Sequence, residues 1–203
     1  MKEELPLFPL QAVLFPGGLL GLKVFEVRYV DLISTCLREQ RQFGVIALRS
    51  GRDVHRHGDQ VSFETVGTFA ELVDVDSDRP GILQVSCRGG SRFNVLTSHQ
   101  RADGLWLART APVADDDVLA PTEAQAATVR GLAEAIATMK ARGVVPFLEP
   151  YRFDDAGWVA NRWCEILPIS HAAKFKLMEL PDPVVRLQLV DDYLRSKGVV
   201  GAG

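Results

Sequence analysis

The chain has 203 residues, of which 47% are hydrophobic and 24% are charged, and its formal net charge is -3 at pH 7. This composition is typical of an ordinary globular protein with one large or two small domains. The slight negative charge excludes a general attraction to nucleic acid or to an anionic membrane. No apolar run approaches the roughly 18 residues of a membrane-spanning helix, so none is predicted.

The first ten residues, MKEELPLFPL, contain acidic residues and prolines. A secretory signal needs a basic start and then a continuous apolar segment, so we expect a cytoplasmic protein. The three cysteines, Cys36, Cys87 and Cys164, are odd in number and far apart. This spacing favours buried reduced thiols over a disulfide framework.

The segment Leu5–Tyr29 contains short apolar runs separated by three prolines and a glycine pair. Because proline has no N–H for a strand ladder, each proline is expected at a strand start, an edge or a bulge. Residues 19–25 alternate with a period of two, which predicts a strand with one buried face. After Phe25 the spacing changes to three and four, which predicts a helix from about Val27 to Arg41.

The next part of the chain has the pattern of short strands joined by turns. Asp76–Gly81 has the composition of a turn, and Gly89-Gly90 is expected to let the chain bend. Many short strands with frequent turn signals predict a small closed or nearly closed barrel. Strands are predicted at 42–48, 61–75, 82–88, 92–96 and 105–110.

From Ala114 the pattern becomes helical. Residues 114–121 are predicted to be a short acidic linker. The predicted fold class is α+β, with a β-rich first half that contains one helix, residues 1–113, and an all-helical second half, residues 122–203. Four helices are predicted. They are 122–142, 155–166, a short helix capped by Ser170, and a last helix from Asp182-Pro183 to Gly198.

Seven stretches together carry a resemblance to a known family. They are LPLFPL (5–10), VLFPGG (13–18), FE-x-RY (25–29), FGVIAL (43–48), VGTFAELVDVD (66–76), CRGGSRFNVL (87–96) and MELPDPVVRLQLVDDYL (178–194). In order and spacing they resemble the amino-terminal substrate-binding domain of Lon-type ATP-dependent proteases, and most closely its stand-alone bacterial homologues. Gly21 and Val27 depart from the pattern, because a proline is expected at both positions in such relatives.

The resemblance implies a PUA-like β-barrel followed by a helical subdomain. It also implies a non-enzymatic module that recognises exposed hydrophobic segments of unfolded polypeptide, as an adaptor for an ATP-dependent protease. Full Lon proteases also carry an ATPase module and a Ser-Lys protease module, and these 203 residues resemble neither. The sequence has no GxxxxGK[ST] and no GxSxG motif, so no catalytic residue and no cofactor is predicted.

Three further patterns are interpreted as structural. Gly89-Gly90-Ser91 lies between two predicted strands and indicates a bulge rather than a nucleophile. Glu26 and Arg28 lie at a helix start, where the helix dipole favours a carboxylate. His55 and His57 would supply two metal ligands where zinc needs three or four, and no metal site is predicted.

Two other functions stay open. An RNA-binding PUA-like protein would use a basic face, although a net acidic chain lacks the charge that supplies most non-specific affinity. A small hydrolase with an unrecognised site is the third hypothesis, and dimerisation through the helical half is also left open. The arginines of the basic face would be Arg49, Arg52, Arg56, Arg88, Arg92 and Arg101.

Four aromatic residues are the predicted peptide-binding positions: Phe8, Phe15, Trp106 and Trp158. Trp158 falls on the polar face of the helix predicted at 155–166, so we expect it to be exposed. Phe8 and Phe15 lie beside prolines at strand edges, with plugging of the barrel end as the alternative role. The side of the strand on which Trp106 lies is undecided. An exposed strand edge would add main-chain pairing with a bound polypeptide.

Overall fold

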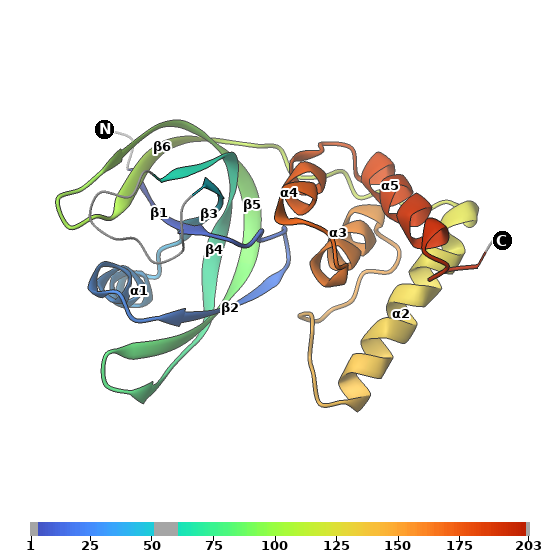
Figure 1. Cartoon of the computed structure of the whole chain (residues 1–203), viewed down its shortest axis with the longest axis horizontal. Coiled ribbons are helices and arrows are strands. Elements are labelled where there is room, and N and C mark those ends of the chain that lie inside the picture. Colours follow the sequence, from blue (N-terminus) through green and yellow to red (C-terminus); the bar gives the residue numbers. More distant parts are fainter. Residues whose placement is uncertain (1–3, 51–60, 202–203) are drawn as a thin grey trace. The chain divides into compact units, whose positions relative to one another are not determined.

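The structure is a computed structural model that describes residues 4–50 and 61–201. The chain forms two compact units, Met1–Asp115 and Asp116–Gly203. The strands belong to the first unit, which also contains one helix, and the other helices belong to the second unit (Figure 1). The predicted α+β class is therefore confirmed.

The first unit is built on one six-stranded sheet. Its elements are β1 Leu5–Leu10, β2 Leu19–Val24, α1 Val27–Glu39, β3 Phe43–Ser50, β4 Ser62–Arg79, β5 Ile82–Gln100 and β6 Trp106–Pro112. The strand order is β2-β5-β4-β3-β1-β6, and β5 also pairs with β6. This additional pairing closes β5, β4, β3, β1 and β6 into a barrel, as the sequence predicts, while β2 joins β5 alone.

β5 is one long strand where the sequence predicts two. Its first half pairs with β2 and its second half with β6, and Gly89-Gly90 lies between the two halves. The Gly89 N–H donates to the Gly18 carbonyl at 2.9 Å. A Cβ at Gly89 would lie 2.2 Å from the Phe15 carbonyl oxygen, so only glycine permits this close approach.

The prolines of β1 lie where the strand has a neighbour on one side only. β6 pairs with β1 at Leu5–Leu7, which includes Pro6, whereas β3 pairs with Leu7–Leu10, which includes Pro9. A residue without an N–H is tolerated at such positions, because the unpaired side of the strand requires no ladder bond. The predicted edge role of these prolines therefore fits, although both lie within the strand.

One hydrophobic cluster of the barrel is organised around Phe93 on β5. Phe93 is fully buried with Leu7, Ile46 and Ala108. An added Cβ at Gly67 would lie 2.4 Å from the Phe93 ring. The ring therefore occupies the space that a side chain at this glycine would need.

Gly67→Ala is expected to destabilise the first unit by about 1–3 kcal/mol, because the new methyl group overlaps the Phe93 ring. The free energy of unfolding in urea, followed by circular dichroism, measures the effect. Gly21→Ala is the matched control, because a Cβ at Gly21 meets nothing within 4 Å. Equal destabilisation by the two changes would contradict this packing.

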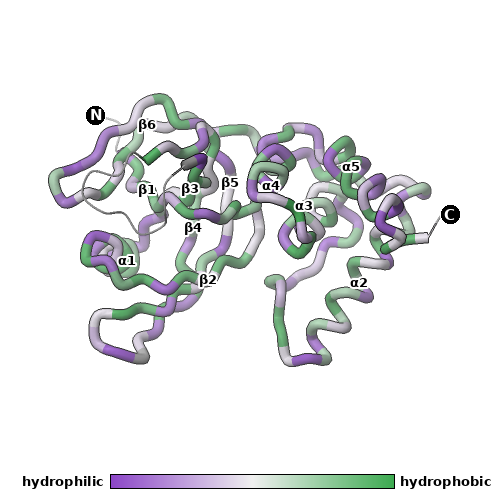
Figure 2. The backbone as a smooth tube through the Cα atoms, in the orientation of Figure 1, coloured by the Kyte–Doolittle hydropathy of each residue, from purple (hydrophilic) through white to green (hydrophobic). Residues whose placement is uncertain are grey.

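The second cluster of this unit joins α1 to the sheet. The stripe predicted from the sequence also includes Leu37, which is exposed, whereas its other members are buried in this cluster. They are Tyr29, Leu32, Ile33 and Cys36. Figure 2 shows the corresponding alternation of hydrophobic and hydrophilic residues along α1. The helix ends at Glu39, and the cap residue Gln40 that follows it has a φ of 52°, in the left-handed region.

The second unit contains four α-helices and one short 3-10 helix among its described residues. Asp155, Ser170 and Asp182 cap three of these helices with their side chains, and the sequence predicts the last two of these caps. No helix in the described part of the chain is long and apolar enough to cross a bilayer. The elements are η1 Glu123–Gln125, α2 Ala126–Ala141, α3 Ala156–Ile166, α4 His171–Glu179 and α5 Pro183–Ser196.

A buried arginine ties the second unit together. Arg186 on α5 donates to the Asp116 carboxylate at 2.6 Å, to the Asn161 side chain at 3.0 Å and to the Leu177 carbonyl at 2.8 Å. Its side chain is 1% exposed, so these contacts take the place of water. The boundary between the units falls inside the predicted linker 114–121, of which Asp116 belongs to the helical unit.

Arg186→Met is expected to destabilise the second unit by about 3–5 kcal/mol, because it leaves the Asp116 carboxylate without its buried partner. Loss of the helical circular dichroism signal in urea measures the change. Arg130→Met on the exposed part of α2 is the control and should stay within about 0.5 kcal/mol of the wild type. A similar small effect at Arg186 would contradict its structural role.

Candidate functional site

Trp158, predicted to be exposed, is buried. Its side chain is 8% exposed and lies against the rings of Phe147, Tyr151 and Phe153, at centroid distances of 5.4 to 6.4 Å. The loop before α3 covers the face that helical periodicity assigns to solvent. The expectation of exposure is therefore wrong, because α3 is buried on all sides from Ala156 to Cys164.

The other three aromatic residues lie in the first unit. Phe8 is buried and stacks on Tyr29 at 4.0 Å, and Phe15 is fully buried. Trp106 is half-buried beside the Phe93 cluster, with its ring edge against Phe63 at 5.2 Å. The structure does not bring the four into one patch, and their part in peptide binding stays a prediction.

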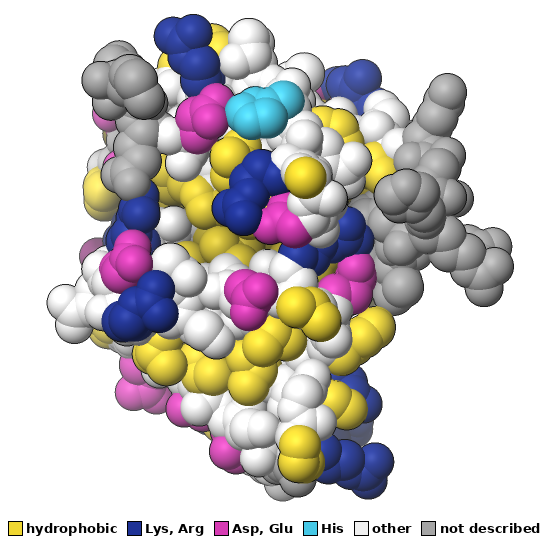
Figure 3. Space-filling view, turned by 90° about the vertical axis from the view of Figure 1, so that its left-hand side faces the viewer, with side chains coloured by type: hydrophobic (Ala, Val, Ile, Leu, Met, Phe, Trp, Pro, Cys, Tyr) yellow, Lys and Arg dark blue, Asp and Glu magenta, His cyan; other side chains and the backbone are white. Residues whose placement is uncertain are grey.

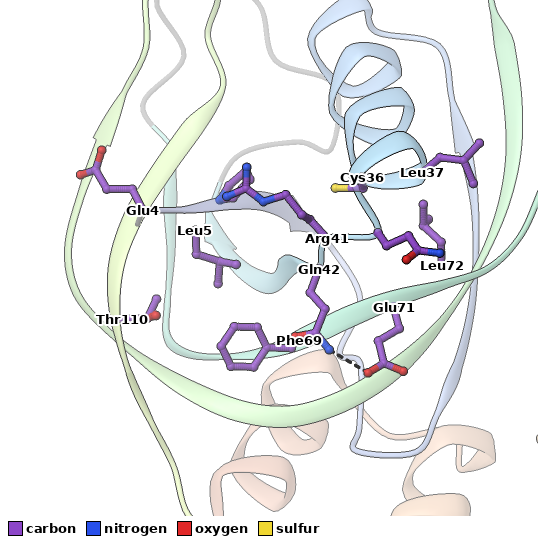
Figure 4. A pocket seen from close by; sticks show the side chains of 12 residues that line it. Glu4, Leu5, Cys36, Leu37, Arg41, Gln42, Phe69, Glu71, Leu72 and Thr110 are labelled. Atoms are coloured by element: carbon purple, nitrogen blue, oxygen red, sulfur yellow. Dashed lines mark hydrogen bonds between the residues drawn. The ribbon is translucent and has the colours of Figure 1, made fainter. Parts of the chain in front are cut away.

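One cavity of the first unit lies between α1 and β4 and reaches β1 and β6, and we call it the α1–β4 groove. Its volume is about 730 Å³, within the range of about 300–1,000 Å³ that ligand pockets occupy. Figure 4 shows apolar and polar side chains projecting toward it from both sides. It is lined by Glu4, Leu5, Pro6, Cys36, Leu37, Gln40, Arg41, Gln42, Phe69, Glu71, Leu72 and Thr110.

The polar groups of the α1–β4 groove are partly fixed by one another. Glu71 accepts hydrogen bonds from Arg88 at 2.5 Å and from Gln42 at 2.7 Å. The bond from Arg88 is the main reason that the pKa of Glu71 lies below its usual value. Leu37 is 58% exposed at the same groove, so the groove offers apolar surface beside a charged rim.

A second cavity lies between the end of β1 and β2, and we call it the β1–β2 seam. Its volume is about 370 Å³. It is lined on one side by Phe8, Leu10, Gln11 and Ala12, and on the other by the consecutive residues 20–24 of β2, with Phe25, Glu26 and Tyr29 completing it. Of the four predicted aromatic residues, Phe8 lines this seam.

Figure 3 shows the side of the molecule that lies at the left in Figure 1. Hydrophobic side chains gather in a hollow and in a band close to it, and side chains of both charges surround them. This arrangement is not predictable from the sequence, because it depends on which residues of several strands and of α1 become neighbours. The sequence predicts only that an exposed strand edge could pair with a polypeptide, without indicating which strand forms that edge.

The three cysteine thiols are not activated for nucleophilic catalysis. Burial and the nearby Glu39 carboxylate raise the pKa of Cys36 to about 11, and burial raises the pKa of Cys87 and of Cys164 to about 12. All three are therefore protonated thiols at neutral pH. Glu26 and Arg28 form an ion pair of 2.5 Å at the start of α1, which fits their interpretation as structural groups.

Metal-binding clusters of histidine, cysteine and carboxylate residues are absent from the part of the chain that the structure describes. His55 and His57 lie outside the described residues. The remaining histidines, His99 and His171, belong to different units.

The arginines proposed for a basic face are largely neutralised where the structure describes them. Arg49 pairs with Glu64 at 2.7 Å, Arg88 with Glu71 at 2.5 Å and Arg101 with Asp103 at 2.6 Å. Arg92 is 2% exposed and donates to the Ala114 carbonyl, while Arg52 and Arg56 lie outside the described residues. These contacts reduce the positive charge that an RNA phosphate backbone would meet.

Comparison with known proteins identifies the fold and the family. The chain matches the model of the ATP-dependent protease La (LON) substrate-binding domain over residues 4–196. It belongs to this family. As a Lon substrate-binding domain it is a binding module.

Two solved Lon amino-terminal domains are similar to this chain. The Lon N-terminal domain protein from Xanthomonas campestris is 29% identical, with a TM-score of 0.74 over 94% of this chain and 98% of that one. The N-terminal domain of the Mycobacterium avium complex Lon protease has a TM-score of 0.63 over 94% and 97% of the two chains. At 17% identity the second likeness shows the fold alone.

Two curated relatives match part of the chain. Lon protease from Anaeromyxobacter dehalogenans (strain 2CP-C) is 30% identical over 126 residues, and the protein cereblon from Xenopus tropicalis is 29% identical over 111 residues. The matches cover 62% and 53% of this Lon-type domain, but 15% and 23% of the relatives.

A thiol reagent added to the native protein at pH 8 is expected to label none of the three cysteines rapidly, because their thiols are buried and protonated. Absorbance of the released chromophore measures the reaction. All three thiols should react once the protein is unfolded in urea. Fast labelling of one thiol in the folded protein would reveal an activated cysteine and revive the hydrolase hypothesis.

Proposed function

We propose that this Lon substrate-binding domain recognises exposed hydrophobic segments of unfolded polypeptide and acts in the cytoplasm as an adaptor for an ATP-dependent protease. This function requires no catalytic step and no cofactor. Its main structural support is the pair of grooves on the first unit, where apolar surface lies beside polar and charged groups.

The size of the grooves fits loose and broadly selective binding. Micromolar affinity corresponds to about 8 kcal/mol, and burying one large apolar side chain contributes about 1.5–3 kcal/mol. Cavities of about 730 and 370 Å³ accommodate a few such side chains, and association itself costs several kcal/mol. A few apolar side chains therefore give moderate affinity without strict sequence selection.

The alternative of RNA binding has less support. The ion pairs of Arg49, Arg88 and Arg101 and the formal net charge of -3 both work against the phosphate contacts that dominate affinity for nucleic acid. A polypeptide with apolar side chains needs no excess of positive charge.

Fluorescence anisotropy with two labelled probes tests this function. The probes are a reduced and carboxymethylated protein, which stays unfolded, and a single-stranded RNA, each at low and at high salt. We expect saturable micromolar binding of the unfolded protein with little salt dependence, because apolar contacts are not screened.

The folded form of the same probe protein is the matched control, and it should not bind. RNA binding that falls with a log-log slope of about -0.7 for each phosphate contacted, without binding of the unfolded protein, would replace our proposal with the RNA hypothesis.

A further inference from the structure

β2 is an edge strand of the first unit. It pairs with β5 through six residues, Leu19 to Val24, and the sheet order places it at one end, next to β5 alone. Its other side therefore has no strand partner among the described residues. Such an edge presents backbone N–H and C=O groups that another extended chain can pair with.

The register shows which groups of β2 point away from β5. The Gly89 N–H donates to the Gly18 carbonyl, and bonded pairs alternate along an antiparallel ladder. Leu20, Leu22 and Val24 therefore bond to β5. The N–H and C=O groups of Gly21 and Lys23 point to the free side.

The β1–β2 seam lies along this free side. A cavity over one face of a strand would be lined by alternate residues, whereas this one is lined by all five residues 20–24. The other side of the seam is formed by β1, which pairs with β6 only at Leu5–Leu7. Phe8 and Leu10 line the seam in the part of β1 that no longer pairs with β6. The seam is thus a gap between two strands.

The two faces of β2 differ in chemistry. Leu20 and Leu22 pack against the hydrophobic cluster that contains α1, whereas Gly21 and Lys23 are exposed. Lys23 has no carboxylate within ion-pair distance among the described residues, in contrast to Arg28, which pairs with Glu26. A chain that pairs with β2 therefore meets apolar surface on one face and a positive charge on the other.

We propose that an extended segment of polypeptide substrate adds to the free edge of β2, with an apolar side chain in the β1–β2 seam and an acidic side chain beside Lys23. The alternation of side chains along a strand sets this pattern, because neighbouring residues of the bound segment face opposite sides. Backbone pairing supplies affinity independent of sequence, and the seam and Lys23 supply selectivity. This inference rests on the proposed function and assigns it a binding mode.

The test uses the full chain and a short fluorescein-labelled peptide in which valine and aspartate alternate, together with the carboxymethylated protein. Gly21→Pro removes an N–H from the free edge and adds a ring there, without removing a bond to β5. We expect it to weaken binding of both probes about tenfold or more. Gly21→Ala keeps the N–H and its Cβ meets nothing within 4 Å, so it should bind both probes more tightly than Gly21→Pro does.

Two further measurements do not depend on the proline variant. A peptide of the same sequence with methylated backbone nitrogens should not bind the wild-type protein, because it cannot donate to β2. Lys23→Glu should weaken binding of the valine-aspartate peptide about threefold and strengthen binding of a valine-lysine peptide, since cross-strand charges interact at this level. Unchanged circular dichroism confirms the fold of each variant.

The outcomes separate this inference from the function on which it rests. If the carboxymethylated protein binds the wild type and Gly21→Pro equally well, while Leu37→Ser in the α1–β4 groove weakens binding, strand addition is wrong and the function stands. If the wild type binds neither probe, both fail. A concentration-dependent dimer in the ultracentrifuge that Gly21→Pro abolishes, with no peptide bound, would assign the edge to a second copy.

Discussion

The change of partner along β5 determines the architecture of the first unit. β5 pairs with β2 up to Arg88 and with β6 from Phe93 onward, so one strand serves two neighbours on the same side. This arrangement closes the barrel with β6 and leaves β2 outside the closed ring. The glycine pair between the two halves permits it, because the backbone of the Phe15–Gly18 turn approaches Gly89 more closely than any side chain would allow. The β1–β2 seam follows from the same change.

The two units are stabilised in different ways. The first unit depends on apolar side chains, with the Phe93 cluster in the barrel and a larger cluster under α1. The second unit also buries charged groups, among them Arg186 with Asp116 and Arg162 with Glu165 at 2.8 Å. Buried ion pairs add little net stability, yet they require particular partners. The contacts of Arg186 connect α5 with Asp116 and with α3 and α4.

Much of the fold was predictable from local signals. Changes of hydrophobic period located β2 and α1, and cap residues located α4 and α5, because these features depend on near neighbours in sequence. The joining of two predicted strands into β5 was missed, since Gly89-Gly90 indicates a bend without showing whether pairing continues. In α1, which has solvent on its other side, the predicted buried face is correct except for Leu37, which is exposed at the α1–β4 groove.

The binding surface was harder to predict. The exposure expected of Trp158 assumed that the polar face of α3 meets water, but Arg162 on that face is itself buried and lies 5.8 Å from the Trp158 ring. Helical periodicity cannot reveal that the loop before α3 covers this face. The seam depends on sheet order and register, which bring residues near position 10 beside residues near position 22. Only the three-dimensional arrangement supplies this information.

The exposed lysine on β2 also affects how the protein behaves in concentrated solution. A free strand edge is a template on which identical chains can assemble into continuous sheets, and natural proteins oppose this with short edge strands and charged side chains. β2 has six residues, and its outer face carries Lys23. Two copies paired edge to edge in antiparallel register about Leu22 would place each Lys23 opposite Gly21 of the other copy, so that the two lysines become diagonal neighbours, and their repulsion disfavours growth. The charge of Lys23 thus protects this edge against aggregation, while the edge stays open to other chains.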